Sequence, residues 1–198
     1  MQIRLAACTD APGIAEIYRP VVVSTPISFE VEPPNHQEIR RRIEKTLLKL
    51  PWLVCEDRSS IAGYAYASPH RERAAYQWSV DVSVYVHSDF RRCGIGRGLY
   101  TSLFEILPAL GYFNAYAGIT LPNPASVGVH ESLGFHPVGV YRNVGYKLGR
   151  WHDVGWWELP LRKPADVPSP LLALNQLLDD PAWPDMLAAG LRYMRTAQ

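Results

Sequence analysis

The segment from residue 82 to residue 110 constrains the fold more than any other part of the chain. A β-rich stretch, Val82-Ser83-Val84-Tyr85-Val86, is followed by the run Arg91-Arg92-Cys93-Gly94-Ile95-Gly96-Arg97-Gly98 and then by a helical pattern to Leu110. Alternating glycines let the backbone approach a ligand closely, and the N–H groups at a helix N-terminus attract anions. The three arginines add fixed positive charge. This segment therefore predicts a pyrophosphate cradle between a strand and a helix.

Two common phosphate motifs do not fit this run. A Walker loop ends in Gly-Lys-Ser/Thr, which is absent here. A dinucleotide fingerprint belongs in an early βαβ unit with an acidic residue about twenty positions later, whereas this run lies in the middle of the chain. Tight packing of a strand against a helix remains the structural alternative for the glycines.

Hydrophobic periodicity predicts an α/β chain with a mixed sheet flanked by helices. Strands are expected near residues 3–6, 52–55, 61–67, 76–86, 115–119, 135–147 and 156–161, and helices near 10–22, 37–50, 98–110 and 124–133. Asp10 is the expected N-cap of the first helix. The second helix has a basic face that includes Arg41 and Arg42, which is either a solvated surface or an anion site.

The composition changes near Pro160. Residues 1–162 are expected to form one domain, and residues 163–198 a Pro-rich linker followed by a short helical tail. The tail is expected to pack either on the domain or on a partner.

Charge and cysteine content exclude several classes of protein. Twenty basic and nineteen acidic residues give a net charge of +1, which argues against a bulk electrostatic grip on nucleic acid or an anionic membrane. Three scattered cysteines indicate neither a disulfide framework nor a metal site. Arg4 and Asp10 interrupt any secretory signal, and no uncharged apolar run approaches the length of a membrane span. We expect a cytoplasmic protein without a metal.

The run Arg91-x-x-Gly94-x-Gly96 resembles the acyl-CoA signature of the GNAT N-acetyltransferases. Residues 2–162 are more closely similar to the phosphinothricin N-acetyltransferase branch, the bialaphos-resistance type. The segments that carry this likeness are Ser28-Phe29-Glu30, Pro51-Trp52-Leu53-Val54, Gly63-Tyr64-Ala65-Tyr66-Ala67, Ala75-Tyr76-Gln77-Trp78, Ser83-Val84-Tyr85-Val86, Leu121-Pro122-Asn123, His130-Glu131-Ser132-Leu133-Gly134-Phe135 and Trp151-His152-Asp153-Val154-Gly155.

The resemblance implies the GNAT fold, a mostly antiparallel central sheet in which two neighbouring strands splay apart. The pantetheine arm of the co-substrate, acetyl-CoA, enters that gap. The residues implied to hold acetyl-CoA are Val84, Tyr85, Val86, Arg91, Arg92, Gly94, Ile95, Gly96, Arg97, Asn123 and Ser126. Residue 92 is commonly glycine in the wider family, and Arg92 is expected to add a phosphate contact.

Two residues are implied to be catalytic. Acetyl transfer to an amine needs a base, because the amine is mostly ammonium at neutral pH, and a proton for the departing thiolate. Asp81 occupies the position of the family's catalytic glutamate and is one methylene shorter, so a bridging water would restore its reach. His130 matches the branch's histidine, which can protonate the thiolate or help deprotonate the amine.

The acceptor pocket is implied to include Phe29, Arg73 and Tyr76. An arginine fork suits a phosphinate, carboxylate or sulfoximine through paired hydrogen bonds. The implied acceptor is a small amino acid such as phosphinothricin, methionine sulfoximine or methionine sulfone, whose amino group attacks the thioester of acetyl-CoA directly in a ternary complex. The family also implies a homodimer.

Two other functions remain open. One keeps the fold and acetyl-CoA but takes another acceptor, such as a polyamine, an aminoglycoside or a peptide N-terminus. The other is a non-catalytic acyl-CoA sensor whose tail docks a partner, an alternative raised by the aspartate at position 81.

Overall fold

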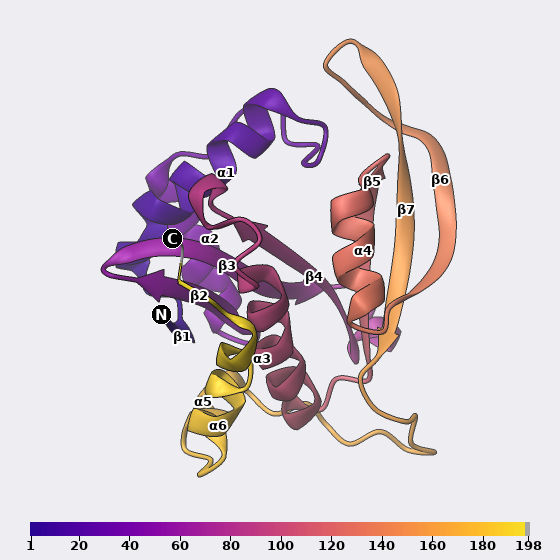
Figure 1. The fold of residues 1–198 in the computed structure, drawn as a ribbon. Coiled ribbons are helices and arrows are strands. Elements are labelled where there is room, and N and C mark those ends of the chain that lie inside the picture. The colour runs from indigo at the N-terminus through magenta and orange to yellow at the C-terminus, as the bar shows by residue number, and fades with distance from the viewer. Residues whose placement is uncertain (197–198) are drawn as a thin grey trace.

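The computed structural model describes residues 1–196 as one sheet with helices on both faces (Figure 1). The strands are β1 (Gln2–Leu5), β2 (Trp52–Asp57), β3 (Ser60–Pro69), β4 (Ser79–Val86), β5 (Asn114–Leu121), β6 (His136–Lys147) and β7 (Arg150–Pro160). The α-helices are α1 (Ala11–Ser24), α2 (His36–Leu47), α3 (Ile95–Leu110), α4 (Pro124–Ser132), α5 (Leu174–Leu178) and α6 (Trp183–Ala188). Short 3₁₀ helices are η1 (Cys8–Asp10), η2 (Ala74–Tyr76), η3 (Ser88–Phe90) and η4 (Leu191–Tyr193).

The seven strands form a mixed sheet in the order β1-β2-β3-β4-β5-β7-β6. Every neighbouring pair is antiparallel except β4 and β5, which run parallel. Those two strands pair only from Ser79 to Asp81 against Asn114 to Tyr116, and beyond that point they separate. The predicted mixed, mostly antiparallel sheet with two splayed central strands is confirmed.

Helices cover the two faces of the sheet differently. The long helix α3 packs its apolar side, including Leu99, Leu103 and Leu107, on the face that also presents Ala65 and Ala117. Helices α1 and α2 cover the opposite face of β2 and β3, where Tyr64 is buried. Since side chains alternate along a strand, each central strand contributes one set of residues to each face.

The structure corrects three details of the sequence analysis. Asp10 is the N-cap residue of α1, as expected, but its carboxylate makes no capping hydrogen bond and instead accepts from Arg4 and from the N–H of Ala7, each at 2.7 Å. The strand expected from residue 76 begins at Ser79, because Tyr76 belongs to η2. The last strand begins at Arg150 rather than at residue 156, since it forms a long hairpin with β6.

The C-terminal tail packs on the domain, one of the two alternatives that the sequence left open. Leu174 and Leu177 are buried in the same core cluster as α3. Ser102 of α3 donates to the carbonyl of Leu187 at 2.7 Å and accepts from the N–H of Gly190 at 3.1 Å. Figure 1 shows the yellow tail lying along α3. In the described part of the chain, no helix has the length and apolarity needed to cross a membrane.

Candidate active site

A cavity of about 60 Å³ lies where β4 and β5 diverge. Its walls come from both strands, from the loop after α1 and from α3 and α4. The lining residues are Ile27, Val82, Ser83, Val84, Tyr85, Tyr100, Ala117, Gly118, Ile119, Thr120, Asn123, Ser126 and His130. The loss of strand pairing therefore leaves backbone of β4 and β5 facing a space, where an extended ligand can pair with it.

Strand alternation divides the residues of β4 between the two faces of the sheet. Val84 and Val86 face the start of α3, where a Cβ added to Gly96 would lie 3.8 and 3.6 Å from their side chains. Tyr85 faces the other way and meets the ring of Tyr18 in α1, with the centroids 5.0 Å apart. Asp81 shares the face of Tyr85, because the two residues are an even number of positions apart. The opening can thus be approached from two sides.

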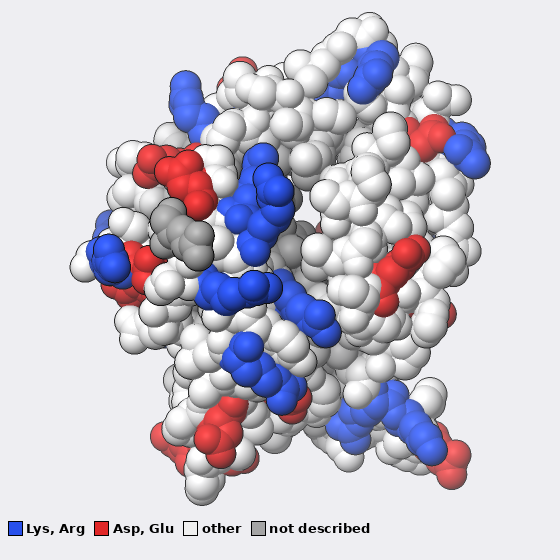
Figure 2. All heavy atoms as spheres, viewed as in Figure 1, with Lys and Arg blue, Asp and Glu red and all other residues white. Residues whose placement is uncertain are grey.

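The loop before α3 has the form of an anion cradle. The helix begins at Ile95, and Gly94 precedes it in the left-handed region with φ +78°. Arg91, Arg92 and Arg97 are exposed, and Figure 2 shows basic side chains gathered in front of this loop and of α3, beside a hollow in the surface. The backbone N–H groups of the first helical turn have no intrahelical acceptors. Geometry and charge both suit a pyrophosphate.

Arg92 also adopts a left-handed backbone, with φ 62°. This region favours glycine, and a non-glycine residue pays about 1–2 kcal/mol to occupy it. The conformation gives a physical reason for the glycine that the wider family commonly has at this position. The arginine keeps the loop geometry at a cost in strain and adds a positive charge.

The C-terminal tail contacts the loop at several points. The N–H of Arg195 donates to the carbonyl of Cys93 at 2.9 Å. The guanidinium of Arg97 lies over the Tyr193 ring, 4.5 Å from its centroid. A Cβ at Gly94 would overlap the Tyr193 carbonyl oxygen. No sequence signal pointed to these contacts, because they join residues about a hundred positions apart.

His130 lies buried on α4 with both ring nitrogens engaged. Nδ1 lies 2.8 Å from the carbonyl oxygen of Ser126, and Nε2 lies 3.2 Å from the hydroxyl of Tyr100. A carbonyl only accepts, so Nδ1 carries the proton and Nε2 accepts from the tyrosine. Burial lowers the pKa of His130, with the Ser126 carbonyl opposing that shift. The imidazole is therefore neutral at pH 7, and Tyr100, which the sequence analysis did not single out, is its partner.

Asn123 and Ser126 hold the start of the helix that carries His130. The Asn123 side-chain oxygen accepts from the N–H of Ser126 at 3.1 Å, which caps α4. Both residues line the cavity. The resemblance implies that both residues lie beside the pantetheine arm; in the structure, Asn123 caps the helix and Ser126 supplies the capped N–H.

Asp81 is hydrogen-bonded to a histidine that the sequence analysis missed. Its Oδ1 lies 2.6 Å from Nδ1 of His70, at the end of β3. The His70 ring stacks on Tyr116 with the centroids 4.4 Å apart, and Tyr116 is paired with Asp81 in the sheet. Burial raises the pKa of the Asp81 carboxyl, and the His70 bond opposes that shift. The pair lies where β4 and β5 begin to separate.

Residues 3–156 match the family model described as an acetyltransferase (GNAT) domain. The chain is a GNAT acetyltransferase. It is 38% identical over 177 residues to a phosphinothricin N-acetyltransferase of Streptomyces viridochromogenes, covering 89% of this chain and 96% of that protein. It is 33% identical to an L-methionine sulfoximine/L-methionine sulfone acetyltransferase of Salmonella typhimurium, covering 81% and 95% of the two chains.

A solved GNAT structure has the same fold. The phosphinothricin acetyltransferase from Sinorhizobium meliloti, determined in complex with acetyl-CoA, matches with a TM-score of 0.79 and 33% sequence identity. The match covers 87% of this chain and 97% of that one. The resemblance to the GNAT family and its phosphinothricin branch is confirmed.

The three acceptor residues expected in this acetyltransferase have different neighbours in the structure. Tyr76 lies beside His70, with ring centroids 5.9 Å apart, and His70 stacks on Tyr116, which pairs with Glu158 of β7. Phe29 packs instead against Gly145, which pairs with His152 of β7. Six strand residues separate Glu158 from His152, which corresponds to about 20 Å.

Arg73 is exposed beside η2, and another arginine is fixed near Asp81. The guanidinium of Arg71 lies 5.4 Å from the Trp156 ring centroid and donates to the carbonyl of His70 at 2.7 Å. Trp156 packs over Gly118 of the cavity wall. These two contacts hold Arg71 next to the Asp81–His70 pair, whereas Arg73 makes no such contact with any residue that the structure describes.

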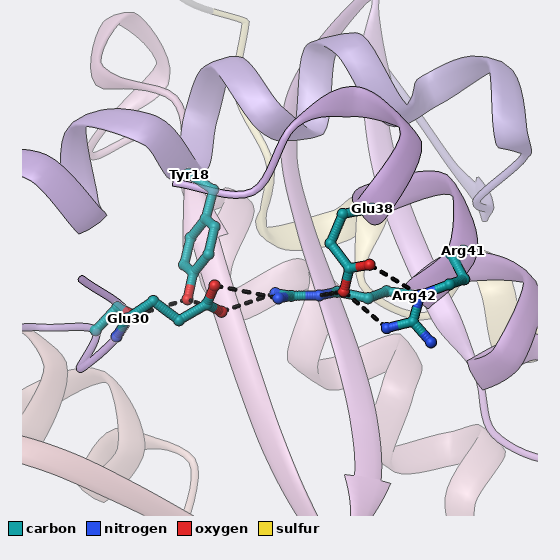
Figure 3. A network of polar contacts seen from close by, with 6 residues as sticks. Tyr18, Glu30, Glu38, Arg41 and Arg42 are labelled. Atoms are coloured by element: carbon teal, nitrogen blue, oxygen red, sulfur yellow. Dashed lines mark hydrogen bonds and ion pairs between the residues drawn. The ribbon is translucent and has the colours of Figure 1, made fainter. Parts of the chain in front are cut away.

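The basic face of α2 is neutralised by carboxylates of the same GNAT domain. Figure 3 shows Arg42 between Glu30 and Glu38, with Arg41 also bound to Glu38. Arg42 donates to Glu30 at 2.7 and 3.1 Å, and Tyr18 donates to the same carboxylate at 3.0 Å. Because the guanidiniums of Arg41 and Arg42 already have carboxylate partners, they support the structural alternative and not an anion site.

The matched segment from Lys147 to Gly155 connects the β6–β7 hairpin to the loop after α1. The ammonium of Lys147 donates to the carbonyl of Ser28 at 2.6 Å, and His152 lies 3.0 Å from the Lys147 carbonyl. This contact positions the loop that carries Ile27 and Phe29 at one end of the opening. Within residues 1–196, no cluster of three or more His, Cys, Asp or Glu side chains could hold a metal.

Proposed function

We propose that this acetyltransferase moves the acetyl group of acetyl-CoA to the amino group of a small amino acid with a polar tetrahedral end. Phosphinothricin, methionine sulfoximine and methionine sulfone are the acceptors we infer. The observation that carries the proposal is the opening between β4 and β5, which has the arginine-rich loop beside it. The acceptor class rests on relatives named for these compounds.

The co-substrate site extends from the loop into the opening. We assign the pyrophosphate to Arg91, Arg92, Gly94, Ile95, Gly96 and Arg97, and the pantetheine arm to Val84, Tyr85, Val86, Asn123 and Ser126. The exposed guanidiniums and the free N–H groups of the first turn of α3 support the first assignment. The unpaired part of β4 supports the second, because its N–H and C=O groups have no strand partner on that side.

The reaction we propose is a direct transfer without an acyl-enzyme. The ammonium of the acceptor loses a proton, and its nitrogen attacks the thioester carbonyl carbon. A C–N bond forms, the C–S bond breaks, and the thiolate takes a proton. The balanced products are the N-acetyl amino acid, CoA with a free thiol, and one proton released to solvent. Backbone N–H groups near Tyr85 and Val86 would stabilise the carbonyl oxygen.

Proton transfer is assigned to the two catalytic candidates. Asp81 would act on the amine side, and His130 on the side of the opening that it shares with Tyr100. The neutral state of His130 supports a role as a hydrogen-bond acceptor within the Tyr100 pair more than a role as a ready proton donor. At the acceptor end, Phe29, Arg73 and Tyr76 remain the proposed contacts, with Arg71 added.

The test is thiol release from acetyl-CoA in the presence of four amines. We expect turnover with phosphinothricin, methionine sulfoximine and methionine sulfone, and none with spermidine, because arginines near the acceptor end repel a polycation. Turnover with spermidine and with none of the three amino acids would show that the acceptor is a polyamine and not an amino acid. Tight binding of acetyl-CoA without turnover of any amine would favour the acyl-CoA sensor instead.

We also propose a homodimer assembled through the β6–β7 hairpin. Strand β6 is an edge strand, and its hairpin exposes Val138, Val144, Tyr146, Leu148 and Trp151, each more than 45% accessible. An exposed apolar edge strand is an aggregation hazard unless a partner covers it. A second copy of this chain would cover it, in line with the expectation from the family.

A further inference from the structure

The Asp81 carboxylate has a protein partner, although it occupies the position expected for a lone base. Its Oδ1 is 2.6 Å from Nδ1 of His70, a distance typical of a charge-assisted hydrogen bond. Both side chains are partly buried, with 13% of His70 and 28% of Asp81 accessible. We propose that His70 is the general base of the transfer and that Asp81 orients it and stabilises the imidazolium.

Aromatic neighbours hold the His70 ring in place. Tyr116 stacks on the ring, while Trp156 and Tyr76 meet it edge-on with centroids 6.1 and 5.9 Å away. Nδ1 is taken by Asp81, so Nε2 is the nitrogen left to act. Among residues 1–196, Nε2 has no hydrogen-bond partner, yet it is not sealed from solvent as the indole nitrogens of Trp52 and Trp156 are.

The His70–Asp81 pair compensates for the short side chain of Asp81. Asp81 has one methylene fewer than a glutamate, so its carboxylate would need a bridging water to reach the amine. An imidazole bound to the carboxylate extends the reach of the base by the width of its ring. Tyr116, which lies under His70, pairs with Asp81 at the end of the parallel ladder, so the base stands at the narrow end of the opening.

The proton transfer is balanced within the proposed reaction. Nε2 of His70 takes one proton from the acceptor ammonium, which leaves a neutral amine and an imidazolium paired with the Asp81 carboxylate. The amine then attacks the thioester, and the imidazolium returns its proton to solvent after the product leaves. The charged groups that face the pair are Arg71, which precedes η2, and Glu158 of β7, which lies next to Tyr116.

The first experiment compares pH–rate profiles and rests on the proposed function. In His70→Gln we expect kcat/KM for the amino acid to fall about 10²–10⁴-fold at neutral pH. The deficit should shrink steadily from about pH 7 to about pH 10, because the amine then deprotonates without a base. Binding of acetyl-CoA, measured by calorimetry, should stay unchanged. A deficit that is constant with pH would assign His70 a structural role and overturn the proposal.

Three further variants serve as controls. Asp81→Asn and the double variant with His70→Gln should be about equally impaired, because two residues that act as one unit lose their joint contribution together. His36→Gln, at an exposed position on α2, should match the unchanged protein. Independent, multiplicative losses in the double variant would contradict a shared role.

A second readout does not depend on turnover. Long-range ¹H–¹⁵N spectra should show His70 protonated on Nδ1 and unprotonated on Nε2 at neutral pH. Protonation on Nε2, alone or together with Nδ1, would leave that nitrogen without the lone pair that a base needs, and the proposal would fail whichever acceptor is used. If the protein acetylated none of the tested amines, the proposed function would fail. The tautomer of His70 would still show whether its Nε2 is free to accept a proton.

Discussion

At the scale of single residues, two glycines of the loop before α3 have different structural roles. Gly94 has φ +78° and lies against the Tyr193 carbonyl, whereas a Cβ at Gly96 would make only ordinary contacts with Val84 and Val86. We expect Gly94→Ala to lower the free energy of unfolding by about 1–2 kcal/mol through backbone strain alone. Gly96→Ala should leave stability unchanged or slightly raised and should raise the KM for acetyl-CoA. Urea unfolding and initial rates measure the two effects.

Shortening the C-terminal tail gives a control for the comparison of Gly94→Ala with Gly96→Ala. In a chain that ends at residue 189, Gly94→Ala escapes the overlap with Tyr193 but keeps the strain of positive φ. The destabilisation should therefore become smaller without vanishing. An equal loss of stability from Gly94→Ala and Gly96→Ala would contradict this account.

At the scale of elements, the C-terminal tail packs into the hydrophobic core and contacts the loop before α3. It buries Leu174 and Leu177, satisfies both hydrogen bonds of Ser102, and holds Arg97 against Tyr193. A chain ending at residue 164 should lose about 1.5–3 kcal/mol for each buried leucine. Its KM for acetyl-CoA should rise more than its kcat falls, because the loop loses its support. Thermal unfolding and steady-state kinetics test both expectations.

A smaller change separates stability from loop support. Ser102→Ala removes the hydroxyl that accepts from Gly190 and donates to Leu187, at a cost of about 1–3 kcal/mol. It leaves the contacts of Arg97 in place, so the KM for acetyl-CoA should stay near its original value. A similar rise of KM in both variants would mean that overall stability, and not support of the loop, controls affinity.

At the scale of the whole molecule, the β6–β7 hairpin extends from the sheet as an arm (Figure 1). The proposed homodimer predicts that Val138→Lys combined with Tyr146→Lys gives a monomer in sedimentation velocity, because two charges would then lie in the apolar contact. Val167→Lys is the matched control, since Val167 is 84% exposed outside the hairpin. Unchanged sedimentation of the double variant would exclude this hairpin as the interface.

The sequence by itself determined the features that depend on short stretches of chain. Alternation and helical spacing predict the order of the elements, because each pattern needs only neighbouring residues. The run from Arg91 to Gly98 predicts the loop, since glycines and arginines act there through the local backbone. The left-handed φ of Arg92 is also a local matter, yet it was not foreseen, because arginine rarely adopts that conformation.

Only the tertiary structure decided which distant residues meet. His70 and Asp81 form a pair because β3 and β4 are antiparallel neighbours. Neither residue by itself indicates in the sequence that the other will be its partner. Tyr193 supports Arg97 because the tail returns along α3. Phe29 packs against Gly145 and Tyr76 against His70 because of the way the loop after α1 and η2 pack on the sheet. Such contacts depend on how whole elements pack, and packing free energy is shared over many residues and is not encoded in any single motif.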